Sequence, residues 1–441
     1  MQRIEDRATI LDAAVSMFRQ QQTRLQGTVT LNDKIALRKR FSELDDELND
    51  YLASQFCKKA TSSAIADWCA QQRPLHWFSE FHSLMQGGGF DVIIGNPPYV
   101  EESAPASSPL GAFATAGCGD LYAYVCERTF HLLREAGRVG LIVPISIFGT
   151  DGFKPLQDIT RKNLSDCWVN SFANRPSQLF TGAQKRLTIF IGTKRSNGTA
   201  KFRTGGYLRW AREERETLFV ARISHCVRNK VFLVFPASLE KIADERQHSI
   251  LSKLLARGER LEICTVKQSP HTVYYTRKFG YFLAFLDFVP EIREIKTGRR
   301  VPPSELKSLA FQSKRSVEAA IAALSSTTFF WFWNVLSDCR NLNRRDLLAF
   351  PLDLSKTPTP LLTKLGDLGR KYLGELVDSS RTMVKSGLQI QTFDYSVCKV
   401  TIDEIDTVLA SYYRLSPDEL DFITNYDIKY RMRPELGEHE E

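Results

Sequence analysis

The feature that most restricts how this chain of 441 residues can fold is a short apolar run that ends in a glycine and two prolines. The run covers residues 90–94, and the segment Gly95–Tyr99, of sequence GNPPY, follows it directly. Apolar runs of this length that stop at turn-forming residues are typical of strands buried in a parallel sheet. The sequence therefore predicts a buried parallel strand over residues 90–94, with Asn96 just beyond its carboxyl end.

Helices and strands are expected to alternate after this strand. Residues 120–135 have the apolar spacing of an amphipathic helix, with Asp120 as its N-cap and Gly137 as the residue that ends it. Residues 153–165 are expected to be helical as well. Three further strands are expected in the segments RVGLIVPIS, CWVNSF and RLTIFIGTK. This alternation with short turns indicates an α/β sheet whose faces are covered by helices.

Four regions are expected along the chain. Residues 1–85 are predicted to be helical, because apolar residues recur there at helical spacing among mixed charges. Residues 86–215 hold the predicted α/β sheet. Residues 216–355 mix short strands, turns and helices with clustered aromatic residues, and a proline-containing connector leads to a helical region over residues 356–441.

The composition is that of an ordinary globular protein, with 43% hydrophobic and 25% charged residues. No apolar run approaches the roughly 18–20 residues that a membrane span needs, and the N-terminus has no signal-peptide core. The nine cysteines are odd in number and lack zinc-ligand spacing, so we expect reduced thiols, no metal site and a cytoplasmic location. The net charge of +8 suits a polyanionic partner such as DNA but does not prove one.

The segment NPPY has the groups needed to handle the amino group of adenine. The N6 lone pair is delocalised into the ring, and two hydrogen-bond acceptors on the N6 hydrogens favour a nitrogen whose lone pair is free. The side-chain oxygen of Asn96 and the carbonyl of Pro97 can supply them, and the ring of Tyr99 offers a flat surface for a flipped base. Ligands of open α/β sheets bind beyond the carboxyl ends of strands, where this segment lies. The alternative interpretation is a plain turn after a strand.

The segment resembles motif IV of amino-methyltransferases that act on DNA, in its adenine-N6 form. The wider frame resembles the methylase polypeptides of type IIG restriction–modification enzymes and related phage-defence methylases. The matching stretches are HWFSEF, GGFDVIIGNPPYV, CGDLYAYVCERTFHLLREAGRVGLIVPISIF, LFTGAQKRLTIFI, SDCRNLNRRDLLAFP and LDFITNYDIKYRM. The resemblance implies a partial doubly wound methyltransferase-like sheet over residues 86–215, an α+β target recognition domain over residues 216–355 and C-terminal helices.

The resemblance also implies roles for single residues. Asn96 and the Pro97 carbonyl would bond the adenine amine, Tyr99 would stack on the base, and Pro98 would lie near the methyl donor. Phe180 occupies the position of the family's second aromatic, which packs on the other side of the base. The alternative for Phe180 is a core aromatic at a strand edge. Contacts with nearby DNA backbone are expected from Gln184, Lys185 and Arg186.

The family binds S-adenosyl-L-methionine through a glycine-rich turn, FxGxG or DPxCGxG, which in this arrangement precedes NPPY. No such unit can be recognised among residues 1–95, and Gly87–Gly89 enters the NPPY strand instead of leaving a donor-binding one. A half-sheet would expose an unpaired strand edge and apolar surfaces. We therefore expect the chain to be inactive by itself. A second polypeptide that brings the donor is favoured over a truncated remnant or a chain that only binds DNA.

Double-stranded DNA is the expected main partner, read by residues 216–355. Asp338 could orient one of the arginines in SDCRNLNRR, although this phrase can equally be a structural turn and helix start. Trp331 and Trp333 are expected in the core. An Asp287 and Glu305-Leu-Lys307 pattern resembles a nuclease metal site and is attributed to chance. The candidate DNA contacts are Lys296, Arg299, Arg300, Arg340, Asn341, Asn343, Arg344 and Arg345, which can reach phosphates or base edges.

Overall fold

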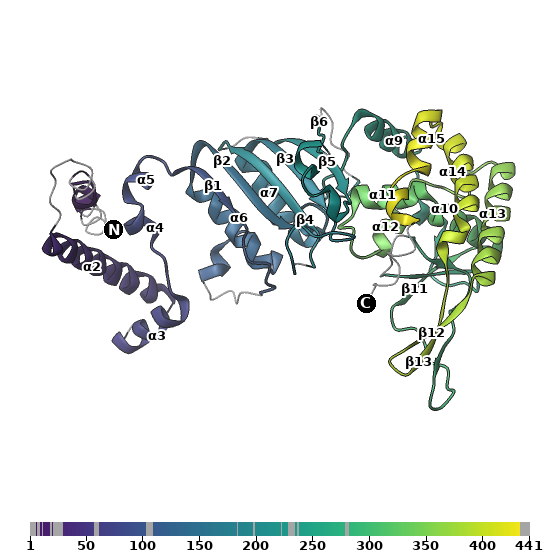
Figure 1. Ribbon diagram of the computed structural model, residues 1–441, viewed down its shortest axis with the longest axis horizontal. Coiled ribbons are helices and arrows are strands. Elements are labelled where there is room, and N and C mark those ends of the chain that lie inside the picture. Colours follow the sequence, from purple (N-terminus) through teal and green to yellow (C-terminus); the bar gives the residue numbers. More distant parts are fainter. Residues whose placement is uncertain are drawn as a thin grey trace. The chain divides into compact units, whose positions relative to one another are not determined.

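The structure is a computed structural model, and it describes most of the chain (Figure 1). The described residues are 6, 9–10, 12–17, 20, 30–56, 61–102, 109–182, 184–196, 199–221, 223–227, 234–235, 238–277 and 282–432. They divide into two compact units. Unit 1 comprises residues 1–142, 155–167 and 190–201, and unit 2 comprises residues 143–154, 168–189 and 202–441. The chain is a mixed α/β protein with several sheets, as the sequence predicts.

Helices precede the sheet in unit 1. They are α2 (Leu31–Phe56), α3 (Ser62–Gln72), α4 (Trp77–Glu80) and α5 (His82–Gln86). Thr61 begins α3, because its side chain accepts a hydrogen bond from the Ala64 amide at 3.3 Å. Helix α2 buries Leu44 and Leu48, which are 1% and 9% exposed, and thus has one apolar side.

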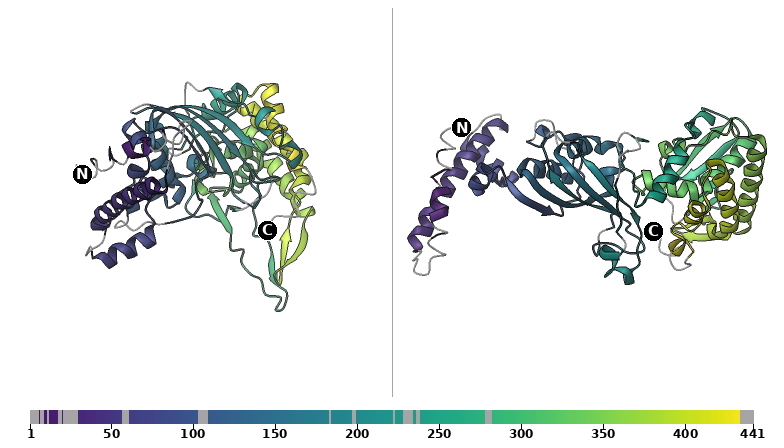
Figure 2. Two further views of the ribbon diagram at one scale, coloured as in Figure 1. Left: turned by 60° about the vertical axis from the view of Figure 1, so that its left-hand side comes forward. Right: turned by 90° about the horizontal axis from the view of Figure 1, so that it is seen from above.

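The largest sheet has six strands in the order β1-β2-β4-β3-β5-β6, so that β4 lies between β2 and β3. Strand β1 runs parallel to β2, and Ile93 lies opposite Val139. Figure 2 shows these strands side by side from two further directions. The strands are β1 (Phe90–Gly95), β2 (Leu133–Pro144), β3 (Leu164–Phe172), β4 (Leu187–Lys194), β5 (Lys201–Leu208) and β6 (Cys226–Val227), and helices α6 (Leu121–Leu132) and α7 (Lys154–Asn163) lie between them in sequence.

The N-cap of α6 is confirmed, whereas its expected end is wrong. The Asp120 carboxylate accepts from the Tyr122 amide at 3.3 Å. The helix ends at Leu132 and β2 begins at once, so Gly137 lies inside the strand. A Cβ at Gly137 would lie 2.9 Å from the carbonyl oxygens of both Phe90 and Arg134. Glycine is needed there for close backbone packing between β1 and β2, not to end a helix.

Strand β1 is parallel as predicted, but the expectation that it is buried is wrong. Val92 is 57% and Ile94 79% exposed. Strand β1 is an edge strand that pairs with β2 on one side only. Ile94 and Ile191 both lie within 4 Å of the Cβ position of Gly140, and Ile191 is 50% exposed. These side chains, Val92, Ile94 and Ile191, form an open apolar surface that we call the β1 face.

Helices form the core of unit 2. Trp331 and Trp333 are each 1% exposed, which confirms that they are core residues. The Asp406 carboxylate accepts from the amides of Thr327 and Thr328 at 3.1 and 2.8 Å and so caps a helix inside this core. The helices of unit 2 are α8 (Leu218–Ala221), α9 (Glu245–Leu255), α10 (Lys314–Ser325), α11 (Thr327–Leu336), α12 (Arg344–Leu348), α13 (Thr359–Asp378), α14 (Lys399–Tyr413), α15 (Pro417–Thr424) and α16 (Ile428–Arg431).

Among the described residues, no single helix has both the length and the apolar character needed to cross a membrane. Helices α10 and α11 reach that character only when taken together, and they are bent by 64° relative to each other.

Two smaller antiparallel sheets and seven short 3₁₀ helices complete the described structure. The four-stranded sheet has the order β7-β11-β8-β9 and the three-stranded sheet the order β10-β13-β12. Their strands are β7 (Thr265–Val266), β8 (Thr272–Thr276), β9 (Phe285–Leu286), β10 (Ile292–Glu294), β11 (Leu306–Phe311), β12 (Arg381–Lys385) and β13 (Leu388–Thr392). The 3₁₀ helices are Pro109–Ala112, Ala116–Cys118, Ile145–Phe148, Asp151–Phe153, Arg212–Glu214, Leu261–Cys264 and Tyr395–Cys398.

The hairpin β12–β13 corrects the expectation that residues 356–441 are helical throughout. Its two-residue turn consists of Ser386 and Gly387, with φ angles of 50° and 77°. Two consecutive positive φ values are typical of the type I′ turns that join the strands of tight hairpins. The segment RTMVKSGLQIQT therefore reverses direction at Ser386 and pairs with itself instead of continuing a helix.

Candidate functional site

The segment Asn96–Tyr99 follows β1 at its carboxyl end, in the place expected for a ligand-binding turn. Asn96 and Pro98 are exposed, Pro97 is buried and Tyr99 is half-buried. The Tyr99 hydroxyl is within hydrogen-bonding reach of the Asn96 side-chain oxygen and lies 3.0 Å from the carbonyl oxygen of Ile142 in β2. The turn is therefore held against the neighbouring strand, with the Asn96 side chain at the surface.

This geometry leaves an acceptor available for a ligand. A carboxamide oxygen has two lone pairs, so Asn96 can accept a hydrogen bond from Tyr99 and a second one from an incoming amine. Burial raises the pKa of Tyr99 to about 12, which keeps its hydroxyl neutral and able to donate at physiological pH. Pro97 fixes its own φ and is buried, which limits movement of its carbonyl.

The glycines before β1 do not form a cradle for S-adenosyl-L-methionine. Gly89 has a φ of 117°, and a Cβ there would lie 2.3 Å from the Leu132 carbonyl oxygen and 2.9 Å from the Arg134 amide. The glycine run thus makes a tight turn against the start of β2 and leaves no room for a ligand at Gly89. The glycine run therefore does not fit the donor, and we derive no chemical step that passes through it.

The segment that precedes β4, in unit 2, holds the expected second aromatic and the expected backbone contacts. Phe180 is half-buried, and Gln184 and Lys185 are exposed. The Arg186 guanidinium donates from Nε to the Tyr207 hydroxyl at 3.2 Å and is thereby oriented. The exposed side chains are free to reach a phosphate, whereas the roles assigned to all four residues remain predictions.

In the segment SDCRNLNRR, several polar groups form hydrogen bonds within the segment or with the residue that follows it. The Asp338 carboxylate accepts from the backbone amides of Arg340 and Asn341 at 2.9 and 3.3 Å and so stabilises the turn. Asn343 begins α12 in a capping box, with its amide 3.0 Å from an Asp346 carboxylate oxygen. These contacts favour the turn-and-helix-start alternative for Asn341 and Asn343.

Arg345 also has structural partners. Its guanidinium donates to the Gly149 carbonyl at 2.9 Å, forms an ion pair with Asp151 and lies 4.6 Å from the centre of the Phe235 ring. Arg340 and Arg344 are exposed, and the Arg344 guanidinium makes one long hydrogen bond, of 3.4 Å, to the Ser308 carbonyl. Of the three arginines in this phrase, these two retain side chains that can reach DNA.

The buried carboxyl of Asp346 predicts a measurable dependence of stability on pH. Burial raises the pKa of Asp346 from 3.8 to about 6, despite its contacts with Asn343 and Arg345. Between these values the folded chain binds the proton more tightly than the unfolded chain, so this group's contribution to stability falls as the pH rises. From pH 4 to pH 7, wild type should lose about 2 kcal/mol of unfolding free energy relative to Asp346→Asn. Urea unfolding of both proteins at pH 4 and pH 7 measures their difference in unfolding free energy. The same difference at the two pH values would contradict the prediction.

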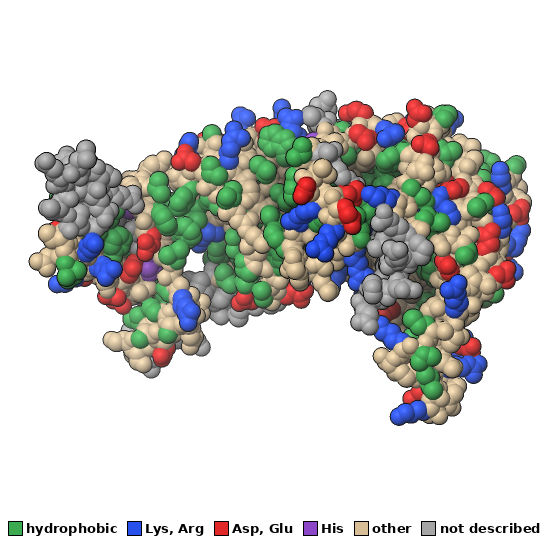
Figure 3. Space-filling view, viewed as in Figure 1, with side chains coloured by type: hydrophobic (Ala, Val, Ile, Leu, Met, Phe, Trp, Pro, Cys, Tyr) green, Lys and Arg blue, Asp and Glu red, His purple; other side chains and the backbone are tan. Residues whose placement is uncertain are grey.

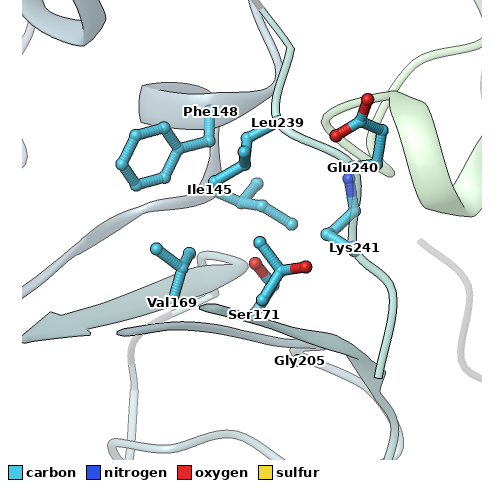
Figure 4. A pocket seen from close by; sticks show the side chains of 9 residues that line it. Ile145, Phe148, Val169, Ser171, Gly205, Leu239, Glu240 and Lys241 are labelled. Carbon is cyan, nitrogen blue, oxygen red and sulfur yellow. The ribbon is translucent and has the colours of Figure 1, made fainter. Parts of the chain in front are cut away.

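Unit 2 contains a small cavity (Figure 4), and no residue of the NPPY turn lines it. It is lined by Ile145, Phe148, Val169 and Leu239 among others, and it has room for no more than about one water molecule. Lys241, at its rim, donates to the Ser337 carbonyl at 2.6 Å, and burial lowers its pKa. The cavity is thus too small for a nucleotide.

Lys296, Arg299 and Arg300, which the sequence predicts to contact DNA, lie beside a sheet that carries two further basic residues. All three are exposed in the segment that follows β10. Strand β13 pairs with β10 and brings the exposed Arg381 and Lys385 of β12 into the same sheet. The alternating pattern of LQIQT directly after Ser-Gly was the signal that could have revealed this hairpin.

Comparisons with known proteins agree with the resemblance seen in the sequence. Residues 13–180 match the family described as Eco57I restriction-modification methylase. A type II restriction enzyme and methyltransferase of Methanocaldococcus jannaschii is 35% identical over 119 residues, which are 27% of this chain and 10% of that protein. The chain is thus matched to about a tenth of that relative's length.

Two solved structures are also similar. The type IIL restriction-modification enzyme MmeI in complex with DNA is 12% identical, with 77% of this chain and 56% of that chain covered and a TM-score of 0.40. A nuclease-deletion mutant of the type ISP restriction-modification enzyme LlaGI is 9% identical, with 83% and 52% covered and a TM-score of 0.34. Residues 13–180, the segment that is similar to the Eco57I restriction-modification methylase family, include the NPPY turn.

Proposed function

We propose that this chain is the adenine-handling and DNA-reading component of a site-specific DNA adenine-N6 methyltransferase in a restriction–modification or phage-defence system. The target base leaves the duplex, and a second polypeptide supplies S-adenosyl-L-methionine as the methyl donor. The observation that carries this proposal is the exposed Asn96 carboxamide at the carboxyl end of a parallel strand, within the segment that matches a methylase family.

The residues of the turn would act on the flipped adenine without themselves forming a bond to it. The Asn96 side-chain oxygen accepts a hydrogen bond from one N6–H group, and the Pro97 carbonyl accepts a hydrogen bond from the other. With both hydrogens engaged, the nitrogen lone pair is directed away from the ring and toward the donor. Tyr99 stacks on one face of the base, and Pro98 lies on the donor side.

Two substitutions at Tyr99 separate stacking from hydrogen bonding. Tyr99→Ala removes the ring and is expected to lower methyl transfer roughly tenfold to a hundredfold, since stacking of a base on an aromatic is worth about 1–3 kcal/mol. Tyr99→Phe keeps the ring and loses only the contacts with Asn96 and Ile142, so its activity should stay within about fivefold of wild type. The measurement is the initial rate of methyl incorporation by the reconstituted enzyme. Equal losses in the two variants would contradict a stacking role.

Binding to duplex DNA is supported by charge and exposure. The chain carries a net charge of +8, and Lys185, Arg340 and Arg344 are exposed. Basic side chains on an accessible surface release counterions from DNA when they contact phosphates, which makes binding sensitive to salt. We propose that these residues, together with Lys296, Arg299 and Arg300, contact DNA.

The β1 face supports the proposal of a second polypeptide. An edge strand offers unpaired backbone groups to another strand, and contiguous exposed apolar side chains mark interaction sites. Val92 and Ile94 lie on such a strand, directly before the catalytic turn. A protein that covers this face would be adjacent to Asn96, where a methyl donor is needed.

A reconstitution experiment tests the proposed function. The full chain is mixed with the products of its neighbouring genes, plasmid DNA and tritiated S-adenosyl-L-methionine, and the tritium bound to DNA is counted. Incorporation should require both this chain and one partner. Calorimetry on the isolated chain should show no binding of the donor. DNA binding without methylation in any mixture would favour a non-catalytic specificity subunit or an inactive remnant instead.

A further inference from the structure

The three-stranded sheet β10-β13-β12 carries a large share of the chain's positive charge. Residues 291–301 and 380–392, which form the sheet and its turns, contain six basic and two acidic residues, or +4 of the chain's +8. Figure 1 shows β12 and β13 projecting from the helices of unit 2, and Figure 3 shows Lys and Arg side chains on this projection. The sheet is therefore a basic element whose surface is open to a partner.

The register of the strands places a set of polar side chains on one face of this sheet. Gln389 of β13 lies opposite Arg293 of β10 and Val384 of β12, and Arg300 forms a bridge with Arg293. Directly opposed residues of antiparallel strands point to the same side, as do residues two apart along a strand. Thr382 therefore shares this side with Val384. We call this surface, formed by Arg293, Arg300, Thr382, Val384 and Gln389, the reading face.

The reading face is accessible and its framework is well fixed. All five of its side chains are exposed. Gln391 lies on the same side, opposite Thr382, and is only partly exposed. It accepts from the Glu291 amide and donates to the Ser380 hydroxyl, both at 3.0 Å, which ties the strands together at the end of the face. The turns at the end of the sheet are joined by a hydrogen bond of 3.0 Å from the Ile295 amide to the Gly387 carbonyl. A bound ligand would thus meet a surface that is already ordered.

We propose that the reading face enters the major groove of duplex DNA and reads base edges there. The major groove, about 12 Å wide, admits a narrow β-ribbon. Arginine matches guanine and glutamine matches adenine, each through two hydrogen bonds, while an aliphatic side chain such as Val384 suits the methyl group of thymine. The Arg293 guanidinium donates two hydrogen bonds to one carboxylate oxygen of Glu291, at 2.6 and 2.9 Å, and this contact orients it. The inference rests on the proposed function only in taking DNA as the ligand.

Basic residues around the reading face are placed to hold the DNA backbone. Lys296 and Arg299 are exposed on the turn after β10. Arg381 and Lys385 are exposed on the outer strand β12; they alternate with Thr382 and Val384 and so start from the opposite side of the sheet, from which their long side chains reach phosphates around its edge. Contacts of this kind fix the register of a protein on the duplex but carry no sequence information. The sheet thus has groups that can contact bases at its centre and groups that can contact phosphates around them. DNA-binding surfaces generally combine these two kinds of contact.

The first test asks whether the reading face determines sequence preference. The full chain selects its preferred duplex from a pool with a randomised segment, and the bound DNA is sequenced. Gln389→Ala should lower affinity for the selected duplex roughly tenfold to a hundredfold and relax the preference at one position. Gln389→Glu should instead move the preference at that position from adenine toward cytosine, which misfolding cannot produce. Gln72→Ala, at an exposed position on α3, is the control and should leave the selected sequence unchanged.

The second test asks whether the surrounding charges contact phosphates. Lys385→Ala should weaken binding to selected and random duplexes alike and reduce the slope of log affinity against log salt by about one. Lys364→Ala, at an exposed position on α13, is the control.

The proposal is overturned if wild type binds no duplex, or if the Gln389 and Lys385 variants match wild type in affinity, salt slope and selected sequence. It is equally overturned if these variants lose a protein partner and not DNA. None of these outcomes depends on methylation. A chain that selects DNA through this sheet but never methylates it would refute the proposed enzyme and leave the reading face supported.

Discussion

Replacing Asn96 by alanine is expected to lower methyl transfer by the reconstituted enzyme about a hundredfold to a thousandfold. The substitution removes one of the two acceptors that hold the adenine amine, and losing one such preorganised group typically costs this factor in rate. Asn96 is exposed in the free chain, so its side chain is available for a ligand. The loss should appear in the rate of transfer and leave DNA affinity nearly unchanged, because duplex binding depends on other residues.

The matched control is Asn425→Ala, at an exposed asparagine in unit 2 whose side chain donates to Asp421 in its own helical turn. Rates of tritium incorporation and duplex affinities are compared for wild type and both variants. An Asn96→Ala enzyme that methylates at the wild-type rate would contradict the assigned role. A parallel loss of DNA binding would point to a folding defect instead.

Ile94→Asp is expected to abolish assembly with the donor-binding partner. Ile94 is 79% exposed, so an aspartate there should leave the isolated chain as stable as wild type. If the β1 face is covered in the complex, the new carboxylate becomes buried without a partner. Such a group typically costs about 3–5 kcal/mol, which is roughly a hundredfold to a few thousandfold in affinity.

Val400→Asp provides the control, because Val400 is 68% exposed on α14, far along the sequence from β1. Co-purification and calorimetry with the partner polypeptide measure the effect, and thermal unfolding of the isolated variants checks their stability. Assembly that survives Ile94→Asp would show that the partner binds elsewhere, and a destabilised isolated chain would show that the β1 face is already covered.

The sheet around the NPPY turn could be predicted from local sequence patterns. The apolar run before Gly95, the N-cap at Asp120 and the strand ending at Pro144 all depend on residues close in the chain. The exposure of Val92 and Ile94 could not be predicted, because an apolar run of this kind is normally covered on both faces. Burial depends on which segments lie against a strand, and the run itself carries no information about them.

The parts that were missed depend on contacts between distant segments. Strand β10 pairs with β13, about a hundred residues later, so the sheet that carries the reading face could not be assembled from local patterns. Likewise, Arg345 is held by Gly149 and Asp151, nearly two hundred residues earlier. The segment SDCRNLNRR has the composition of a DNA-binding loop, and these long-range partners reveal the structural role of its Arg345.

The most direct test of the central claim is the identity of the methylated nucleoside. The chain is expressed with its neighbouring genes in a host that lacks adenine methylation, and the DNA is hydrolysed and quantified by mass spectrometry. We expect N6-methyldeoxyadenosine with the wild-type chain and only a trace with Asn96→Ala. Methylated cytosine in its place, or equal amounts of N6-methyldeoxyadenosine from both chains, would contradict the assignment of the NPPY turn to the adenine amine.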